Sequence, residues 1–287
     1  MPINQTQHTM QQTKTKPLTP FLKWAGGKTL LAPRLAEMYK PFRDTHTWVE
    51  PFCGALGAAL GVKPERAILS DSNPHLINLY DHISFGLQST VNYENSQDAF
   101  KQIKTDFNRS LNPDSGFIAG DWWKAKAFYY LNRTCFNGLC RFNQKGEFNV
   151  GYGKYKSPKL DHDFSIYQAA FRYWDFFNFG YETALSLSKE HIRSTFIYAD
   201  PPYDGGFVGY SGKFIWDYQV NPASKLAELN CPVVASNKAT NRIIDLYTNL
   251  GFSLDFIDVR RRIACNGDRK PAREILATRN ICQTLTH

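Results

Sequence analysis

Residues 195–203 read TFIYADPPY, and this stretch decides how the rest of the chain is interpreted. Thr195–Asp200 is an apolar run with β-branched residues, which predicts a strand buried on both faces. Two prolines follow at once, and each fixes its own φ and removes an N–H donor. The strand therefore ends in a rigid corner that presents carbonyl oxygens and the Asp200 carboxylate, with Tyr203 directly after it.

Further apolar runs predict an open, mostly parallel α/β sheet. The other candidate parallel strands are His46–Glu50, Ala67–Asp71 and Pro232–Ser236. Asn73-Pro74 opens a helical stretch after the second of them. At the end of the chain, Gly251–Arg260 and Arg273–Arg279 predict a hairpin with Asn266-Gly267 in its loop. Sheets of this class bind ligands at the carboxyl ends of their strands, which is where Asp200 lies.

The middle of the chain interrupts this alternation, because residues 85–163 offer no good parallel strand. They contain helical stretches at Asp98–Ser110 and Asp121–Asn132, then a predicted hairpin of Arg141–Asn143 with Glu147–Val150 that turns at Lys145-Gly146. We therefore expect a catalytic domain of residues 20–84 and 164–287 and an inserted helical domain of residues 85–163. Residues 1–19, rich in Gln, Thr and Lys, are expected to form a disordered tail.

The distribution of charge predicts a polyanionic partner. The chain has 287 residues, a formal net charge of +8 and a pI of about 9.1. Arg133–Lys159 carries six Lys or Arg and one acid, and Arg260–Arg279 carries seven and two. Two basic clusters of this kind indicate surfaces that bind phosphates, and nucleic acid is the commonest such partner.

The cysteines and the apolar runs exclude several classes of protein. The six cysteines form no CxxC pair and no Cys/His spacing suited to zinc, so we expect no metal. The N-terminus has no apolar signal core, and no apolar run is long enough to span a bilayer. We expect a cytoplasmic protein with reduced thiols and no membrane partner.

The corner that follows Thr195–Asp200 suits a planar amine. The Asp200 carboxylate can accept one N–H and the Pro201 carbonyl the other, while Tyr203 stacks on the ring. The lone pair of adenine N6 is delocalised into the ring, and two acceptors would localise it and align it for attack. Asp200 then positions the amine and balances developing charge, and it need not be a strong base.

A second pattern predicts a nucleoside-binding turn. Glu50–Gly54 (EPFCG) ends a strand, and glycine there lets the backbone approach a ligand closely. Asp71 ends the next strand about 20 residues on, the spacing at which an acid binds ribose hydroxyls. The chain has no GxxxxGK[ST] loop, which favours a nucleoside without a phosphate chain.

With these motifs the sequence resembles the Dam-type (D12 class) N6-adenine DNA methyltransferases from Phe21 to about Asn280. Beside EPFCG, LSDSN (Leu69–Asn73) and DPPY, the matching motifs are FLKWAGGK (Phe21–Lys28), LNRTCFNGLCRFNQKGEFNVGYGKYK (Leu131–Lys156), VRRRIACNGDRK and REIL. The resemblance implies a Rossmann-like class I methyltransferase sheet with an inserted target-recognition domain bearing a β-hairpin. It also implies transfer of a methyl group from S-adenosylmethionine to N6 of a flipped-out adenine in double-stranded DNA, within GATC or a related short site. We expect a DNA-associated monomer or weak dimer.

The resemblance assigns roles to matching positions. The expected catalytic residues are Asp200, Pro201 and Tyr203, and the expected cofactor-binding residues are Trp24, Lys28, Phe52, Gly54, Asp71 and Asp200. Lys23 and Arg141 would contact guanines, and Leu139 would meet a thymine methyl. Phe136 would wedge into the base stack beside Asn137. Tyr155 would complete these contacts, and Arg260 and Arg261 would hold phosphates.

Three positions depart from the common pattern of the family. Leu56 replaces a second glycine in the cofactor turn, although Gly54 is kept. Phe136 replaces a common Tyr and can still stack. Gly151 replaces a common base-contacting Pro, which weakens the case for GATC.

Some alternatives stay open from the residues alone. The same corner could serve cytosine N4 or a protein glutamine amide, although the aspartate favours adenine. A DNA-binding regulator that has lost catalysis should lack DPPY or the cofactor acids. RNA is a third possible substrate, disfavoured because a base-reading hairpin cannot enter its narrow major groove. Ser236-Asn237 ends a strand at the same edge and could touch either the cofactor or the extruded base.

Overall fold

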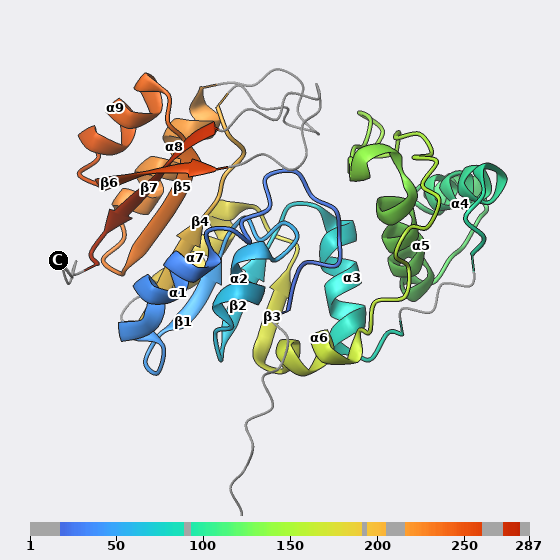
Figure 1. Cartoon of the computed structure of the whole chain (residues 1–287), viewed down its shortest axis with the longest axis horizontal. Helices are drawn as coiled ribbons and strands as arrows, with labels where there is room; N and C mark the ends of the chain where they lie inside the picture. Colours follow the sequence, from blue (N-terminus) through green and yellow to red (C-terminus); the bar gives the residue numbers. More distant parts are fainter. Residues whose placement is uncertain (1–17, 89–92, 191–193, 205–215, 260–271, 282–287) are drawn as a thin grey trace, which may run out of the picture.

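The computed structural model describes residues 18–88, 93–190, 194–204, 216–259 and 272–281, and its centre is a seven-stranded sheet (Figure 1). The strand order is β3-β2-β1-β4-β5-β7-β6. The strands are β1 (Thr47–Glu50), β2 (Ala67–Ser70), β3 (Trp174–Phe177), β4 (Thr195–Ala199), β5 (Val233–Lys238), β6 (Ser253–Val259) and β7 (Ala272–Arg279). The first five are parallel, and β7 runs antiparallel to both β5 and β6. The predicted mostly parallel sheet and its closing hairpin are confirmed, although the hairpin's loop lies outside the described residues.

The order of the strands creates a switch point between β1 and β4. From β1 the chain builds outward through β2 to β3, whereas β4 and β5 extend the sheet in the other direction. Such a reversal leaves a crevice at the carboxyl ends of the two central strands. Glu50 ends β1 and Asp200 follows β4, so the fold places these two acids at the same edge of the sheet.

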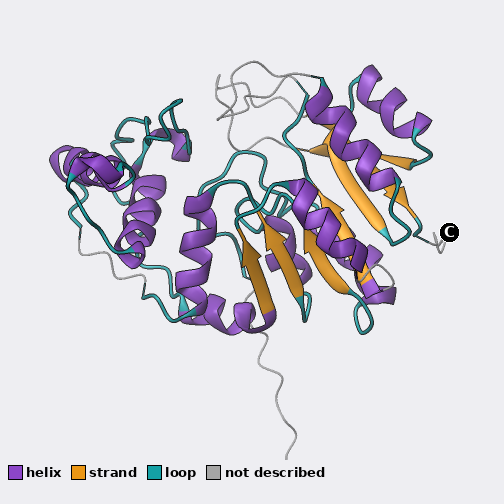
Figure 2. Ribbon diagram, turned by 180° about the vertical axis from the view of Figure 1, so that it is seen from behind, coloured by secondary structure: helices purple, strands orange, loops and turns teal. Residues whose placement is uncertain are grey.

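Helices cover both faces of the sheet, which Figures 1 and 2 show from opposite sides. On one face α1 (Ala32–Tyr39), α2 (Gly57–Val62), α3 (Pro74–Ser84) and α6 (Ser165–Ala170) enclose a core in which Trp48 stacks on Phe196 at 5.2 Å. On the other face α7 (Tyr181–Glu190), α8 (Asp217–Ala227) and α9 (Asn241–Asn249) enclose a second core. Because both faces are covered, the central strands are apolar on both sides, as the continuous apolar run of β4 predicts.

The edge strand β3 was not predicted. Its sequence, WDFF, lacks β-branched residues and carries an exposed aspartate, so it gives no pattern of a buried strand. Burial alternates along it, which is the behaviour of a strand with one solvated face.

Two predicted helices lie to the side of the sheet, beyond α3 (Figures 1 and 2). They are α4 (Gln97–Ser110) and α5 (Asp121–Thr134), and α5 packs between α3 and α4. Short 3₁₀ turns lie at Lys40–Phe42, Pro113–Ser115, Phe136–Gly138 and Phe171–Tyr173. No helix in the described part of the chain is long and apolar enough to cross a membrane.

The predicted hairpin after α5 is smaller than expected. Its turn forms, because the Gly146 amide donates to the Asn143 carbonyl at 2.9 Å. Pairing between its arms is limited to an isolated bridge of Phe142 with Phe148, and a second bridge joins Cys135 to Tyr152. The predicted arms therefore lie antiparallel on either side of the predicted turn, but they form no regular strand ladder. Two backbone hydrogen bonds join the arms, from Asn143 to the Glu147 carbonyl at 2.9 Å and from Asn149 to the Arg141 carbonyl at 3.1 Å, and the two phenylalanines are buried against each other.

Candidate active site

Asp200 lies at the corner after β4 and is held by two side chains. The Lys28 Nζ is 3.0 Å from its Oδ2, and the Ser236 Oγ donates to its Oδ1 at 2.7 Å. Lys28 is itself nearly buried and also donates to the Gly26 carbonyl at 2.7 Å. The contacts from an ammonium and a hydroxyl fix the orientation of this carboxylate.

Tyr203 packs beside this ion pair. Its hydroxyl donates to Glu274 Oε2 at 2.8 Å, and Lys28 Nζ lies 4.6 Å from the centre of its ring. Burial, followed by the charge of Asp200, raises the pKa of Tyr203 well above its ordinary value. The phenol therefore stays protonated at neutral pH. It serves as a hydrogen-bond donor and a flat apolar surface and not as a base.

The turn after β1 is tied to the end of β2. Asp71 accepts the Gly54 amide at 3.1 Å and the Asn73 amide at 2.9 Å. Burial raises the pKa of Asp71, and these two hydrogen bonds act in the opposite direction. Gly54 has a φ of +45°, and a Cβ there would meet the Trp24 indole nitrogen at 3.1 Å. Glycine is therefore needed at position 54 both for its backbone conformation and for close packing.

Glu50 is a buried acid at the end of β1, and it was not among the site residues expected from the sequence. The Trp48 indole donates to its Oε1 at 2.6 Å. Burial is the largest effect on its pKa, which rises to about 8; the bond from Trp48 lowers it and the charge of Asp200 raises it. Near neutral pH Glu50 is mostly protonated and can donate a hydrogen bond into the cavity that it lines.

These residues enclose a cavity of about 520 Å³ at the carboxyl ends of β1, β2 and β4. Its walls include every residue expected to bind the cofactor or to act in catalysis, namely Trp24, Lys28, Phe52, Gly54, Asp71, Asp200, Pro201 and Tyr203. Among the described residues, no cluster of His, Cys, Asp and Glu could hold a metal ion. The cavity thus combines apolar walls with convergent carboxylates and an ammonium, the composition of a small-molecule site.

One wall of this cavity was missed in the sequence. Tyr181, at the start of α7, stacks on Phe52 with ring centres 5.4 Å apart, and Phe179 lines the same wall. Both follow β3, so they could not be placed before that strand was known. The aromatic run FFNFGY over residues 176–181 was the only signal of them.

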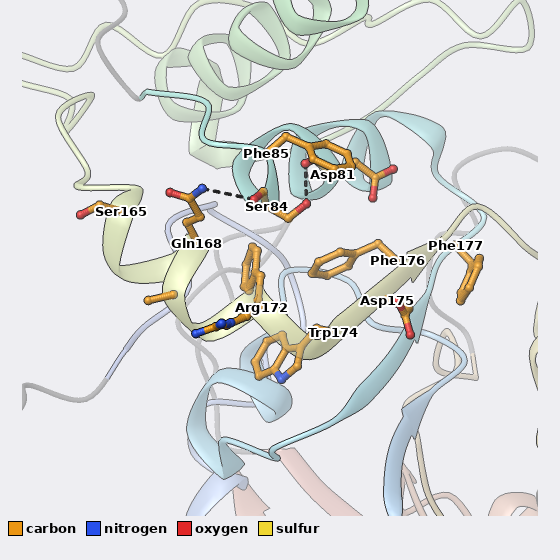
Figure 3. A pocket seen from close by; sticks show the side chains of 12 residues that line it. Asp81, Ser84, Phe85, Ser165, Gln168, Arg172, Trp174, Asp175, Phe176 and Phe177 are labelled. Atoms are coloured by element: carbon orange, nitrogen blue, oxygen red, sulfur yellow. Dashed lines mark hydrogen bonds between the residues drawn. The ribbon is translucent and has the colours of Figure 1, made fainter.

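A second cavity, of about 600 Å³, lies on the outer side of the edge strand β3 (Figure 3). Gln168 of α6 donates to the Ser84 carbonyl of α3 at 3.3 Å and closes one end of it. Asp81, Asp175 and Arg172 also contribute to its walls. None of the residues singled out in the sequence lines it, so the cavity at the strand ends is the candidate active site.

The residues expected to contact DNA lie in different surroundings. Phe136 is 53% exposed and Asn137 is exposed, whereas Leu139 is buried in the wall of the active-site cavity, which the half-buried Arg141 also lines. Lys23 Nζ lies 3.4 Å from the centre of the Tyr155 ring. Arg260 and Arg261 lie outside the described residues. The structure therefore brings Leu139 and Arg141 to the rim of the catalytic cavity and leaves Phe136 and Asn137 facing solvent.

Lys23 is held tightly at its main chain. Its amide donates to Asn132 Oδ1 at 2.9 Å, and Asn132 Nδ2 donates to its carbonyl at 2.8 Å. Burial lowers the pKa of Lys23 to about 8, with a further decrease from the charge of Arg133. This pair of bonds joins the N-terminal segment that carries Trp24 and Lys28 to the end of α5.

Comparisons with known proteins agree with this geometry. The family model described as "D12 class N6 adenine-specific DNA methyltransferase" matches residues 24–263. The chain is 33% identical over 273 residues to the retron Ec67 DNA adenine methylase of Escherichia coli, with 91% of each chain covered. It is 33% identical to the DNA adenine methylases of Escherichia coli K12, over 275 residues, and of Vibrio cholerae, over 278. Each of those two alignments covers 90% of this chain and 94% of the relative.

Proposed function

The chain belongs to the D12 class of N6 adenine-specific DNA methyltransferases, and on that premise we propose that the cavity at the strand ends holds S-adenosylmethionine while Asp200 and Pro201 grip an adenine flipped out of duplex DNA. One observation carries the proposal. Asp200 stands at the carboxyl end of β4, charged and oriented, inside a cavity large enough for a nucleoside. The target is proposed to be GATC or a related short site.

The walls of the cavity fit the cofactor that the family uses. Trp24 and Phe52 provide flat apolar surfaces, and Asp71 is a carboxylate of the kind that binds ribose hydroxyls. Because Gly54 has no side chain, the backbone of the turn can approach a bound cofactor closely. When bound, S-adenosylmethionine supplies an electrophilic methyl group on a sulfonium. Lys28 would hold Asp200 in place at the boundary between the cofactor and the base.

The roles of the chain's own groups follow from their contacts. Asp200 already interacts with Lys28 and Ser236, and each carboxylate oxygen has a further lone pair to accept an N–H of the adenine amine. We take the Pro201 carbonyl as the second acceptor, because Pro201 directly follows Asp200 and lines the cavity, whereas the Pro202 carbonyl already accepts a hydrogen bond from Gln219 at 2.6 Å. Two acceptors placed in this way draw the N6 lone pair out of conjugation before the attack.

Three features support DNA as the partner of the neighbouring surface. We propose that residues 85–163 form the target-recognition domain. Phe136 is a half-exposed aromatic at the tip of a 3₁₀ turn, which suits insertion into a base stack. Arg141 lines the cavity, and we assign it to a base pair next to the extruded adenine. Lys154, Lys156 and Lys159 add positive charge in the same segment.

The test is chemical and works whatever short sequence the protein recognises. Purified protein would be incubated with unmethylated bacterial DNA and labelled S-adenosylmethionine, and the DNA digested to nucleosides. The label should appear in N6-methyl-2′-deoxyadenosine, and label in a cytosine derivative or in protein would contradict the proposal. Sequencing that detects modified adenines would then give the recognition site. Modified adenines outside GATC and related short sites would refute the proposed target sequence.

A further inference from the structure

Ser236 and Asn237, the two residues whose role the sequence leaves open, lie behind the catalytic corner. Both are on β5, which pairs with β4 so that Ala199 is opposite Ala235. The next position on each strand therefore places Ser236 beside Asp200. Ser236 is 0% and Asn237 1% exposed, and neither lines the active-site cavity. They are thus shielded from both the cofactor and the base.

Ser236 connects Asp200 to a buried tyrosine. Tyr198 has its hydroxyl 2.9 Å from the Ser236 Oγ, which in turn is 2.7 Å from Asp200 Oδ1. A serine hydroxyl has one proton, and an ionised carboxylate can only accept, so that proton belongs to the bond with Asp200. Tyr198 must then be the donor to Ser236. Burial, followed by the charge of Asp200, raises the pKa of Tyr198 well above its ordinary value and keeps this donor protonated.

Asn237 holds the other end of the corner through Gln219. Its Nδ2 donates to Gln219 Oε1 at 2.6 Å, and Gln219 Nε2 donates to the Pro202 carbonyl at 2.6 Å. Gln219 is 2% exposed and belongs to α8. Neighbouring residues of a strand point to opposite faces, so the two chains of hydrogen bonds approach the corner from the two sides of the sheet.

We propose that Ser236 and Asn237 are positioning residues that fix the corner for methyl transfer, a role that rests on the proposed function. Ser236 fixes Asp200 through Oδ1 from inside the protein, so that Oδ2, on the side of Lys28, faces the cavity. Asn237, through Gln219, fixes the Pro202 carbonyl and with it the direction of the peptide that carries the Pro201 carbonyl. Preorganised acceptors of this kind act on the rate of the chemical step and not on binding.

The test measures single-turnover methyl transfer at saturating DNA and cofactor, together with the Kd of each. Ser236→Ala should slow transfer about 10-fold or more, because a hydrogen bond to a charged group is lost. Asn237→Ala acts one link further away and should slow it about 3-fold. The Kd for S-adenosylmethionine and for DNA should stay within about two-fold of the wild-type values.

Ser70→Ala is the matched control. Ser70 is also a buried serine at the end of a parallel strand, and its Oγ has no hydrogen-bond partner within the described part of the chain. Its replacement should leave the transfer rate unchanged. A similar loss in Ser70→Ala and Ser236→Ala would mean that general packing of the sheet, and not the bond to Asp200, sets the rate.

A double variant separates positioning from stability. Ser236→Ala leaves the buried Tyr198 hydroxyl unpaired, which lowers the free energy of unfolding. Adding Tyr198→Phe removes that hydroxyl and should restore part of the stability while the transfer rate stays low. A transfer rate that recovers together with stability in the double variant would overturn the proposal. So would a wild-type transfer rate in Ser236→Ala, or a weakened binding of S-adenosylmethionine in Ser236→Ala large enough to account for its slower transfer. An inactive wild-type protein would instead contradict the proposed function.

Discussion

The active-site cavity and the segment that follows α5 are built in different ways. The cavity is centred on residues at the ends of neighbouring strands, Glu50, Asp71 and Asp200, whose positions are set by the backbone ladders of the sheet, and Leu139 and Arg141 reach it from the segment after α5. Residues 135–156, here named the recognition segment, have only the two isolated bridges as β-pairing. They depend instead on side chains from α4 and the residues before it. Asn108 pairs with both backbone groups of Phe148, at 2.8 and 3.0 Å, and Asn95 donates to the Tyr155 carbonyl at 2.8 Å.

With the roles proposed above, this difference separates the chemistry from the reading of DNA. A residue at the end of a strand inside a sheet is held by many backbone bonds, so its position withstands changes elsewhere. The recognition segment includes positive φ values at Asn137, Gly138, Gly146 and Lys154, and its path depends on a few long-range side-chain bonds. We infer that substitutions of cavity residues outside the recognition segment affect catalysis at constant specificity. Substitutions in the recognition segment should affect specificity while the cofactor site stays intact.

The largest effect is expected for Asp200→Ala. Loss of the carboxylate removes the main acceptor for the amine and leaves the Lys28 ammonium unpaired in a nearly buried place. Methyl transfer should fall by at least about 10³-fold, since one electrostatic contact in an active site is worth 10²–10³ and the acceptor also aligns the amine. Radiolabel transfer measures the rate, and fluorescence anisotropy should show DNA affinity close to that of the wild type. Retained transfer would refute the role assigned to Asp200.

Two glycines sharpen the comparison directly. A Cβ at Gly57 would lie 2.8 Å from the backbone nitrogen of Lys28, whereas a Cβ at Gly153 would lie 2.7 Å from the Cys135 carbonyl oxygen. In each case backbone has to move, and overpacking of this kind costs about 1–3 kcal/mol. Gly57→Ala should weaken cofactor binding about 10-fold with little change in site preference. Gly153→Ala should change the site preference and leave cofactor binding nearly unchanged.

Isothermal titration with S-adenosylmethionine and competition between cognate and non-cognate DNA give the two readouts. Each variant serves as the control for the other, because both add one methyl group at a close backbone approach. If both variants lose cofactor and DNA affinity to the same extent, the cavity and the recognition segment are one mechanical unit and the distinction fails.

A smaller and more local effect is expected for Arg141→Ala. An arginine that binds a base bidentately contributes about 1–3 kcal/mol of discrimination at that base pair. The variant should accept other bases at one position of the site and keep its preference at the rest. Methylation of an oligonucleotide set with every single substitution in the cognate site measures this. An unchanged pattern would remove Arg141 from base reading.

The part of the molecule built from strand patterns could be predicted from the sequence. The apolar runs that end at Glu50, Asp71 and Asp200 gave β1, β2 and β4, and parallel strands bring their carboxyl ends together. The eight residues expected to bind the cofactor or to act in catalysis line one cavity, and Trp24 and Lys28 reach it from outside the sheet. β3 was missed because four residues without β-branching carry no strand pattern, and the wall formed by Phe179 and Tyr181 was missed with it.

Contacts between distant residues could not be predicted. The bonds that place the recognition segment join Asn95 and Asn108 to residues 40 or more positions away. Polar side chains of this kind have the same local pattern whether they face solvent or hold a loop. The hairpin turn could be predicted from Lys145-Gly146, whereas its lack of a strand ladder could not. For the same reason the role of Ser236 became visible only when β4 and β5 were side by side.

The smallest expected effect concerns Lys23. As the pH rises, its lowered pKa should increase the stability of the protein and decrease its affinity for DNA. Burial lowers its pKa from 10.5 to about 8, so between these values the unfolded chain binds more protons than the folded one. The free energy of unfolding therefore gains a contribution that rises as the pH goes from 8 to 10.5. The contact with DNA that the family resemblance implies for Lys23, in contrast, requires the ammonium. The complex keeps a proton that the free protein loses above pH 8, so DNA affinity falls as the pH rises.

Between pH 7 and pH 9 this single group should weaken DNA binding by no more than about 10-fold. Lys23→Met keeps the length of the side chain over the Tyr155 ring but cannot titrate. Other groups, such as Glu50 with its pKa of about 8, titrate in both proteins, so only the difference between the two pH profiles reports on Lys23. Anisotropy at several pH values gives the affinities, and urea unfolding gives the stabilities. If DNA affinity depends on pH in the same way in wild type and in Lys23→Met, the amine at position 23 does not contact DNA. The DNA-binding surface would then not include the Lys23–Tyr155 contact.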